Sequence, residues 1–313
     1  MSQSTNHIMM IKPTGFGFNA QTAKNNHFQF SDNSLDKNNI VAKAIQEFDS
    51  FVEILRQKNI NVIVVNDLYY MSTPDAVFPN NWFSTHMDGT VCLYPMYAPN
   101  RRKERNDGVF KLLANQYDFE ISNIEDFTAN ENENAFLEGT GSMVIDRINK
   151  IVYASISERT NADLLLVVCE KLNYELVSFK SYHTASENSS LIYHTNVMMC
   201  VATSFAVVCL ESILDISERQ LLVDQLNKTN KTIIEISFAQ MFSFAGNMLE
   251  VKGKEDQVYL VMSSSAFKSL SDSQKLAIEK YAVIIHSSLH TIEKYGGGSA
   301  RCMMAELFLP RSI

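Results

Sequence analysis

The fold is decided near the end of the chain, in the stretch Gly296-Gly297-Gly298-Ser299-Ala300-Arg301-Cys302-Met303-Met304-Ala305-Glu306-Leu307-Phe308. A glycine run lets the backbone approach a ligand closely and adopt angles that other residues avoid. Arg301 stands beside Cys302, and a neighbouring cation favours the nucleophilic thiolate. A strand-like apolar segment follows. The pattern therefore predicts a positioned cysteine nucleophile at the mouth of a strand.

The strand predicted at 301–304 opens a structural unit, and four earlier segments repeat its pattern. Each consists of an opening strand, a return strand, a helix and a last strand. The opening strands are predicted to begin at Asn80, Gly141, His194 and Gly246, and the return strands at Val91, Ile151, Ala206 and Val258. Helices are predicted over about 102–116, 161–172, 217–226 and 272–281, and last strands over 119–121, 175–177, 232–236 and 283–285. A period of about 50–60 residues is typical of propellers and repeat arrays.

The fifth unit has only its opening strand at the end of the chain, so the beginning of the chain must complete it. Residues 8–11 supply the return strand, 38–57 the helix and 61–65 the last strand. Closing a ring in this way removes free sheet edges. We predict a five-bladed, pseudo-symmetric α/β propeller of strand–strand–helix–strand units, formed by one domain over residues 1–313. The alternative is a generic α/β domain whose similar segments arose by chance.

Composition narrows the function classes. The net charge of -8 argues against nucleic acid as a partner, because phosphate binding needs a basic surface. No apolar run reaches membrane-spanning length, and the first residues lack the basic region of a signal peptide. We therefore expect no membrane association and a cytoplasmic location.

The 5 cysteines are scattered, and no CxxC pair occurs. Four of them lie in apolar runs, where free cysteine packs as a small hydrophobic side chain: Cys92, Cys169, Cys200 and Cys209. We expect neither a disulfide framework nor a zinc site. A phosphate-binding glycine loop of the P-loop type is also missing. His286 and His290 are four residues apart but have no third ligand nearby, so we expect no metal. We expect no cofactor either, because a thiol and an imidazole suffice for the chemistry considered below.

Polar or reactive residues mark the openings of the units. Asn81, Asn196, Asn247 and Cys302 each lie at the start of a predicted strand, and Glu138 lies just upstream of another. In a ring of blades these strand starts converge on the axis. Residues far apart in the sequence are therefore expected to meet in one pocket.

Three motifs resemble the guanidino-group-modifying enzymes of the pentein fold, which include arginine deiminases, dimethylargininase-like hydrolases and amidinotransferases. They are Phe136-Leu137-Glu138-Gly139-Thr140-Gly141-Ser142, Tyr193-His194-Thr195-Asn196 and the glycine-rich stretch ending at Cys302. The order Glu, His, Cys matches that superfamily. The run Asp75-Ala76-Val77-Phe78-Pro79-Asn80-Asn81-Trp82 resembles the signature of its citrulline utilisation hydrolases.

The chemistry of a ureido or guanidino carbon suits these residues. Three heteroatoms donate into that carbon, so covalent catalysis divides a difficult cleavage into two easier steps. Cys302 would attack the carbon, and His194 would protonate the departing nitrogen and then activate water. Glu138 would hold the planar NH groups against the sulfur. Taken singly, each residue has an alternative as a buried thiol, a structural histidine or a solvated glutamate.

The amino-acid end of a substrate needs its own partners. Arginine pairs well with a carboxylate because its fork meets two oxygens. Resemblance to the dimethylargininase-like hydrolases places such arginines at Arg101 or Arg102 and at Arg159, with Arg101 preferred to Arg102. Asp75 is expected to meet the substrate's amino group or to orient its loop.

Amides replace two acids of the arginine deiminase pattern. Asn196 stands where deiminases have an aspartate, and Asn80 and Asn81 replace an acid of the first blade. A guanidinium offers only donors, whereas a ureido group is neutral and presents a carbonyl acceptor. We therefore predict hydrolysis of citrulline to ornithine, carbon dioxide and ammonia. These asparagines are alternatively structural residues that turn the chain.

Two other functions stay open on the sequence alone. One is a deiminase, a dimethylargininase-like hydrolase or an amidinotransferase acting on a guanidino substrate. The other is a non-catalytic pentein that binds ribosomes, which fits poorly with the negative charge. The expected partner is a small amino-acid substrate, and the expected assembly is a homodimer.

Overall fold

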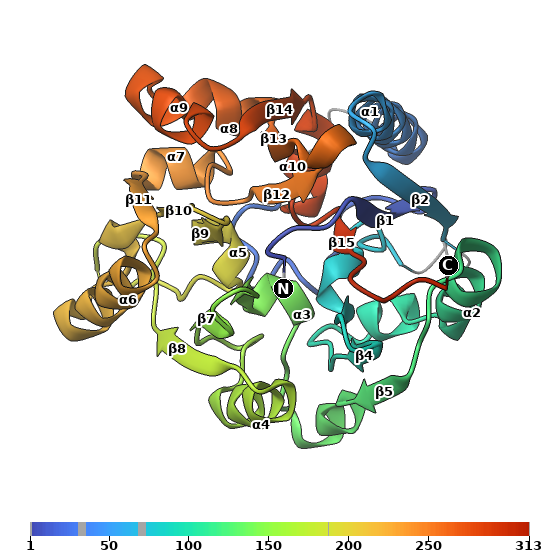
Figure 1. Ribbon diagram of the computed structural model, residues 1–313, viewed down its shortest axis with the longest axis horizontal. Coiled ribbons are helices and arrows are strands. Elements are labelled where there is room, and N and C mark those ends of the chain that lie inside the picture. The colour runs from blue at the N-terminus through green and yellow to red at the C-terminus, as the bar shows by residue number, and fades with distance from the viewer. Residues whose placement is uncertain (1, 31–35, 68–72, 187, 313) are drawn as a thin grey trace.

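The computed structural model describes residues 2–30, 36–67, 73–186 and 188–312. Five three-stranded sheets surround a common axis, and long helices lie around the outer rim (Figure 1). In every sheet the central strand is antiparallel to one neighbour and parallel to the other. This repeat confirms the predicted five-bladed α/β fold. No helix within the described ranges is long and apolar enough to cross a bilayer.

The five sheets follow one another along the chain. With the central strand in second place, they are β3 (Phe83–Thr85), β4 (Thr90–Leu93) and β5 (Asn123–Asp126); β6 (Val144–Asp146), β7 (Ile151–Ser155) and β8 (Glu175–Phe179); β9 (Met199–Val201), β10 (Phe205–Val208) and β11 (Thr232–Glu235); β12 (Leu249–Lys252), β13 (Val258–Ser263) and β14 (Val283–Ser287); and β15 (Ala305–Glu306), β1 (His7–Lys12) and β2 (Asn61–Asn66). The rim helices are α2 (Asp107–Tyr117), α4 (Ala162–Leu172), α6 (Ile216–Lys228), α9 (Asp272–Glu279) and α1 (Lys37–Gln57).

Shorter helical elements connect these units. They are η1 (Pro79–Asn81), η2 (Arg101–Glu104), η3 (Thr128–Glu133), α3 (Gly139–Ser142), α5 (Thr195–Met198), η4 (Leu210–Ser212), α7 (Phe238–Phe242), η5 (Lys254–Asp256), α8 (Ser264–Ser269) and α10 (His290–Gly296).

The fifth sheet joins the two ends of the chain, as predicted. Strand β1 pairs antiparallel with β15, with Ile8 opposite Glu306, and parallel with β2. Gln3 adds a further tie, because its side-chain amide donates to the carbonyl oxygens of Ile145 (2.9 Å) and Val201 (3.2 Å). The start of the chain thus links three blades.

Helix α1 shows why the rim helices form where they do. The Asp36 side chain caps the helix by accepting from the Asn39 backbone N–H at 3.0 Å. Apolar residues at helical spacing then face the sheet, and those buried are Ile40, Ala44, Phe48, Phe51, Val52 and Leu55. The sequence prediction for this helix is confirmed.

The openings of the units differ from the prediction. The segments predicted as opening strands begin with a helical turn in the first three units, formed by η1, α3 and α5. The last unit opens with hydrogen-bonded turns over 299–304, and its strand is only Ala305–Glu306. Each turn brings backbone and side chains of one unit onto the next. At Gly139, for example, φ is +47° and a Cβ atom would lie 2.5 Å from the Asn80 carbonyl oxygen.

Two further predictions were wrong in detail. The last strand of the first unit is Asn123–Asp126, not 119–121. Phe119, whose apolar side chain suggested a strand, packs instead edge-on against His7 of the fifth blade, with ring centroids 5.4 Å apart. The predicted helix 102–116 is divided, because η2 ends at Glu104, Arg105 is extended, and Asn106 caps the start of α2 by accepting from the Gly108 N–H at 2.9 Å.

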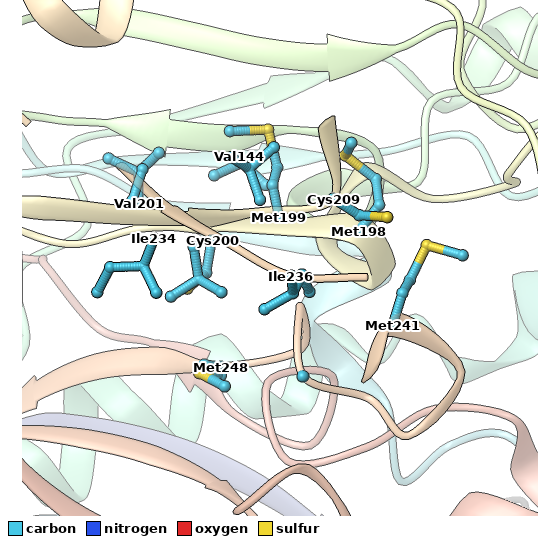
Figure 2. Close-up of a cluster of buried hydrophobic side chains, with 14 of the residues drawn as sticks. Val144, Met198, Met199, Cys200, Val201, Cys209, Ile234, Ile236, Met241 and Met248 are labelled. Carbon is cyan, nitrogen blue, oxygen red and sulfur yellow. The ribbon is translucent and has the colours of Figure 1, made fainter. Parts of the chain in front are cut away.

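Sulfur-containing side chains fill much of the core around the third blade (Figure 2). Figure 2 shows Met198, Met199, Cys200, Cys209, Met241 and Met248 among branched aliphatic residues. Flexible thioethers fill irregular gaps well, which suits the junctions between twisted sheets. All five cysteines are free and buried. Burial raises the pKa of Cys92, Cys169, Cys200 and Cys209 to about 12, so these four thiols are inert at neutral pH.

Candidate active site

The glycine run brings the Cys302 segment against the first blade. Gly297 ends α10 with φ at +66°, in the left-handed region that favours glycine. A Cβ atom at Gly298 would lie 2.8 Å from the ring of Phe78. Cys302 follows in a tight turn, in which its N–H donates to the Ser299 carbonyl at 3.0 Å. The thiol is thereby held in a buried position, with 4% of the residue exposed.

Two amides contact the sulfur of Cys302. Asn196 Nδ2 lies 3.4 Å from it and Asn247 Nδ2 lies 3.2 Å from it. The orientation of Asn247 is fixed because its Oδ1 accepts from the Arg301 N–H at 3.0 Å and its Nδ2 also donates to the Asn196 carbonyl at 2.9 Å. Two N–H donors aimed at one sulfur stabilise negative charge on it. Asn247 was noted in the sequence only as a strand-start asparagine, without a role at the thiol.

Glu138 and His194 form the second part of the site. His194 Nε2 donates to Glu138 Oε2 at 2.8 Å, and Glu138 Oε1 accepts from the Tyr97 N–H at 2.9 Å. Burial alone would raise the pKa of Glu138, but the Arg159 guanidinium and the His194 hydrogen bond outweigh it and hold that pKa well below its usual range. Burial lowers the pKa of His194 to about 4, against the opposing effect of Glu138. At neutral pH the pair is therefore a carboxylate and a neutral imidazole with Nδ1 free to act as a base.

The structure separates the two adjacent arginines. Arg101 is buried and lines the pocket, whereas Arg102 lies outside it, 3.4 Å from Glu131 and hydrogen-bonded to the Met96 carbonyl at 3.1 Å. Arg101 is already engaged, because its Nε and Nη2 meet the two oxygens of Glu104, each at 2.9 Å. The paired N–H edge expected to grip a substrate carboxylate is therefore occupied.

Arg159 reaches the pocket from the second blade. Its Nε donates to Asn25 Oδ1 at 3.0 Å and its Nη2 to the Thr22 carbonyl at 3.0 Å. The guanidinium stacks on the Tyr193 ring, with the carbon 4.6 Å from the centroid. Its Nη1 lies 3.5 Å from Glu138 Oε2. Arg159, which lines the pocket, is thus held by neutral partners at Nε and Nη2, and its Nη1 faces Glu138.

Asp75 sits opposite, under the segment that follows β1. Its Oδ2 accepts from Asn19 Nδ2 at 2.7 Å and from Thr22 Oγ1 at 3.2 Å, while its buried Oδ1 has no partner among the residues that the structure describes. Burial raises the pKa of Asp75, and the nearby Arg101 opposes this. Asn19, Thr22 and Asn25 were missed by the sequence analysis, because short polar residues in a loop look the same whether they face solvent or a pocket.

Most of the site residues predicted from the sequence line one pocket. It is lined by Asn26, Asp75, Phe78, Asn81, Arg101, Arg159, Tyr193, His194, Gly296, Gly297, Gly298 and Cys302. Glu138 and Asn196 lie directly behind His194 and Cys302. Asn80 is fully buried. Its carbonyl accepts from Thr140 Oγ1 at 3.2 Å, and within the described ranges neither polar atom of its side chain has a partner. Residues from all five blades and the N-terminal segment thus meet at one thiol.

Solved structures with the same fold cover almost the whole chain. The N-terminal domain of ArgZ, covalently bound to a reaction intermediate, matches with a TM-score of 0.71 at 17% identity, over 97% of this chain and 99% of that one. Full-length apo ArgZ, an arginine dihydrolase of the ornithine-ammonia cycle in cyanobacteria, matches with a TM-score of 0.74 at 16% identity; 98% of this chain covers 41% of that one. A dimethylarginine dimethylaminohydrolase adduct with S-methyl-L-thiocitrulline matches with a TM-score of 0.63 at 16% identity, over 96% and 98% of the two chains. No curated protein sequence matches this chain.

The sequence itself matches the family described as "N,N dimethylarginine dimethylhydrolase, eukaryotic" over residues 12–309. That range contains every residue of the pocket and both partners of the Glu138–His194 pair. The chain belongs to this family of hydrolases, within the guanidino-modifying enzymes of the pentein fold.

Proposed function

We propose that this hydrolase cleaves the ureido group of citrulline, or of a close analogue, to give ornithine, carbon dioxide and ammonia. The observation that carries the proposal is the orientation of Asn81. Its Oδ1 accepts from Arg101 Nη1 at 2.8 Å, and its Nδ2 is buried and has no partner among the described residues. That Nδ2 lies beside His194, because a Cβ atom placed at Gly141 would be 2.4 Å from it and 2.8 Å from His194 Nδ1. A ureido oxygen can accept from this N–H, whereas a guanidinium has no acceptor to offer.

The reaction proceeds in two halves. The Cys302 sulfur attacks the ureido carbon, a C–S bond forms, and one C–N bond breaks as His194 delivers a proton to the departing nitrogen. Water then attacks the thiocarbamate while His194 accepts its proton, and the C–S bond breaks to restore the thiol. The released carbamate loses carbon dioxide and leaves an amine. The net reaction consumes one citrulline and one water.

The protonation states of the free site support this sequence. With its pKa lowered to about 4, His194 is neutral at physiological pH and takes the thiol proton as the sulfur attacks. The amide N–H groups of Asn196 and Asn247 stabilise the charge that develops on the sulfur. His194 then carries the proton that the leaving nitrogen needs, so no external acid is required.

The charged ends of the amino acid have partners at the other side of the pocket. We assign the substrate carboxylate to Arg159 Nη1 and the ammonium to Asp75 Oδ1, the carboxylate oxygen that has no protein partner. Arg101 supports the site instead of gripping the carboxylate, because Glu104 occupies its paired edge. We further propose that residues 1–313 act as one catalytic domain.

A guanidino substrate is the second candidate, and the charge of the site favours it. Three buried carboxylates, Asp75, Glu104 and Glu138, face two buried guanidiniums, Arg101 and Arg159. With all five ionised, the cluster carries one excess negative charge, which a cationic substrate would neutralise. Burial raises the pKa of Glu104 to about 7, so this excess charge is complete only above neutral pH. Arginine dihydrolases among the structural relatives support the same alternative.

Product analysis separates the candidates. Wild-type protein is incubated with citrulline, arginine or N,N-dimethylarginine, and ornithine, citrulline and ammonia are quantified by mass spectrometry and an ammonia assay. Citrulline hydrolysis predicts equal amounts of ornithine and ammonia from citrulline and little turnover of the other two. Arginine converted to citrulline that accumulates would overturn the proposal. Added glycine, converted to guanidinoacetate, would reveal an amidinotransferase.

A further inference from the structure

The guanidinium of Arg101 is bound on nearly every side by the protein. Of its five N–H groups, Nε and one on Nη2 meet Glu104, the second on Nη2 meets the Phe78 carbonyl at 3.2 Å, and Nη1 donates to Asn81 Oδ1 at 2.8 Å. Arg101 and Glu104 are both buried, with side chains 3% and 1% exposed. The arginine is therefore a fixed strut between Glu104 and Asn81.

That strut determines which end of the Asn81 amide faces the substrate. Because Oδ1 is tied to Arg101, Nδ2 is the other end of the amide, and it is buried without a partner in the described ranges of the chain. Its position is known from Gly141, where an added Cβ atom would lie 2.4 Å from Asn81 Nδ2 and 2.8 Å from His194 Nδ1. The fixed N–H groups thus stand beside the catalytic imidazole, next to the space where a reacting group must sit.

We propose that Glu104 is a positioning residue that sets substrate selectivity: through Arg101 it holds the Asn81 amide with its N–H groups toward the substrate's central group. An acceptor oxygen at that place is bound, whereas the NH₂ of a guanidinium would face a donor with a donor. This inference rests on the proposed citrulline activity and extends it. It also gives Glu104, which is not among the residues lining the pocket, a role that a purely structural ion pair would not have.

Substitution of Glu104 should loosen the strut. In Glu104→Gln one carboxylate oxygen becomes an NH₂ facing an Arg101 N–H, so one of the two contacts is lost and the guanidinium shifts. Asn81 is then free to turn its Oδ1 toward the substrate. Glu104→Asp keeps both oxygens on a shorter arm and should restore part of the effect. Glu131→Gln is the matched control, because Glu131 pairs with Arg102 and Arg105 outside the pocket.

The test is the ratio of kcat/KM for citrulline to kcat/KM for arginine in wild type and in these variants, with folding checked by circular dichroism and the melting temperature. We expect Glu104→Gln to lower the ratio by about tenfold or more, Glu104→Asp to lower it less, and Glu131→Gln to leave it within about twofold. A folded Glu104→Gln protein that loses both activities equally, or neither, would overturn the inference. The proposed function would still stand, because it is tested by the turnover of citrulline by the wild-type protein.

A second variant covers the case in which Glu104→Gln does not fold. Asn81→Asp replaces the inward N–H groups by a carboxylate oxygen and leaves Glu104 unchanged. The ratio should again fall by about tenfold or more, with arginine bound more tightly. An unchanged ratio in this variant contradicts the inference. Wild-type protein that does not turn over citrulline at all would overturn both the inference and the proposed function.

Discussion

The two sides of the pocket, one for the chemistry and one for substrate recognition, differ in how many of their polar groups already have protein partners. On the chemical side, Glu138, His194 and Cys302 each contact another protein group, through the His194–Glu138 bond of 2.8 Å and the Asn247–Cys302 contact of 3.2 Å. On the recognition side, two pocket-lining residues each keep a buried polar atom that has no partner within the described part of the chain, Asp75 Oδ1 and Asn81 Nδ2.

This difference indicates what each side does. Groups that already hold one another need no rearrangement during the reaction, which is the condition for efficient catalysis. Each buried unpaired polar atom costs about 1–3 kcal/mol. A ligand that supplies partners for these atoms removes that cost, so it is favoured over a ligand that cannot. Changes on the chemical side should therefore lower kcat for every substrate, and changes on the recognition side should alter KM or the choice of substrate.

The largest effect is expected at the thiol. Cys302→Ala removes the nucleophile, and kcat should fall by at least about 10⁴-fold while substrate still binds. Steady-state kinetics and isothermal titration calorimetry measure the two quantities. Cys169→Ala is the matched control, because Cys169 lies in α4 away from the pocket, and it should retain activity. Comparable losses in both variants would show that the thiol is not specifically required.

Glu138→Gln should give the next largest loss. The glutamine side chain carries no negative charge. It therefore no longer stabilises the imidazolium that forms on His194 during the reaction. We expect kcat to fall by about 10²–10⁴-fold with a much smaller change in KM. A variant that mainly raises KM would show that Glu138 acts in substrate recognition, which would contradict the proposed difference between the two sides of the pocket.

Asp75→Asn tests the recognition side itself. Its free Oδ1 is assigned to the substrate ammonium, and replacing the charge should raise KM by about 10–100-fold with kcat changed far less. The analogue that lacks the α-amino group provides a control, since wild type and variant should handle it alike. Equal discrimination by the two proteins between citrulline and this analogue would contradict the assignment.

The sequence predicted the architecture better than the site. Repeated apolar patterns and caps such as Asp36 locate the sheets and rim helices, because burial and local hydrogen bonds are encoded nearby in the chain. The completion of the last blade by β1 also followed from counting strands. The helical turns that open the units were missed, since Asn81 and Asn196 are placed there by contacts with neighbouring blades and not by local propensity.

The roles of the arginines show the same limit. Arg101 and Arg102 are adjacent and chemically equal in the sequence, yet one is a buried strut on Glu104 and the other pairs with Glu131 outside the pocket. Likewise, nothing in the local pattern around Asn25 indicates its hydrogen bond to Arg159, which is 134 residues away. Pairings of this kind depend on the tertiary fold.

The smallest predicted effect concerns His183. It tests whether a buried polar group without a partner must take part in substrate binding. His183 is buried outside the pocket and stacks on Phe242, with ring centroids 6.0 Å apart, and neither ring nitrogen has a partner among the described residues. Burial lowers its pKa to about 4. Between about pH 6.5 and 4 the unfolded chain binds a proton there that the folded protein does not, so wild type loses stability as the pH falls.

His183→Phe removes this proton uptake. Relative to wild type, the variant should gain about 2 kcal/mol of unfolding free energy between pH 7.5 and pH 5. Urea denaturation at the two pH values measures the difference. A gain that does not change with pH would show that His183 titrates normally, and that its unpaired nitrogens are accessible to solvent in the folded protein.

The central claim is that Cys302 attacks the ureido carbon of citrulline. The most direct measurement is rapid acid quenching of the enzyme with citrulline labelled at the ureido carbon, followed by peptide mapping. We predict label on the peptide that contains Cys302, its decay at the rate at which labelled carbon dioxide appears, and no label in Cys302→Ala. Absence of label with citrulline, together with label on Cys302 from arginine labelled at the guanidino carbon, would contradict the account.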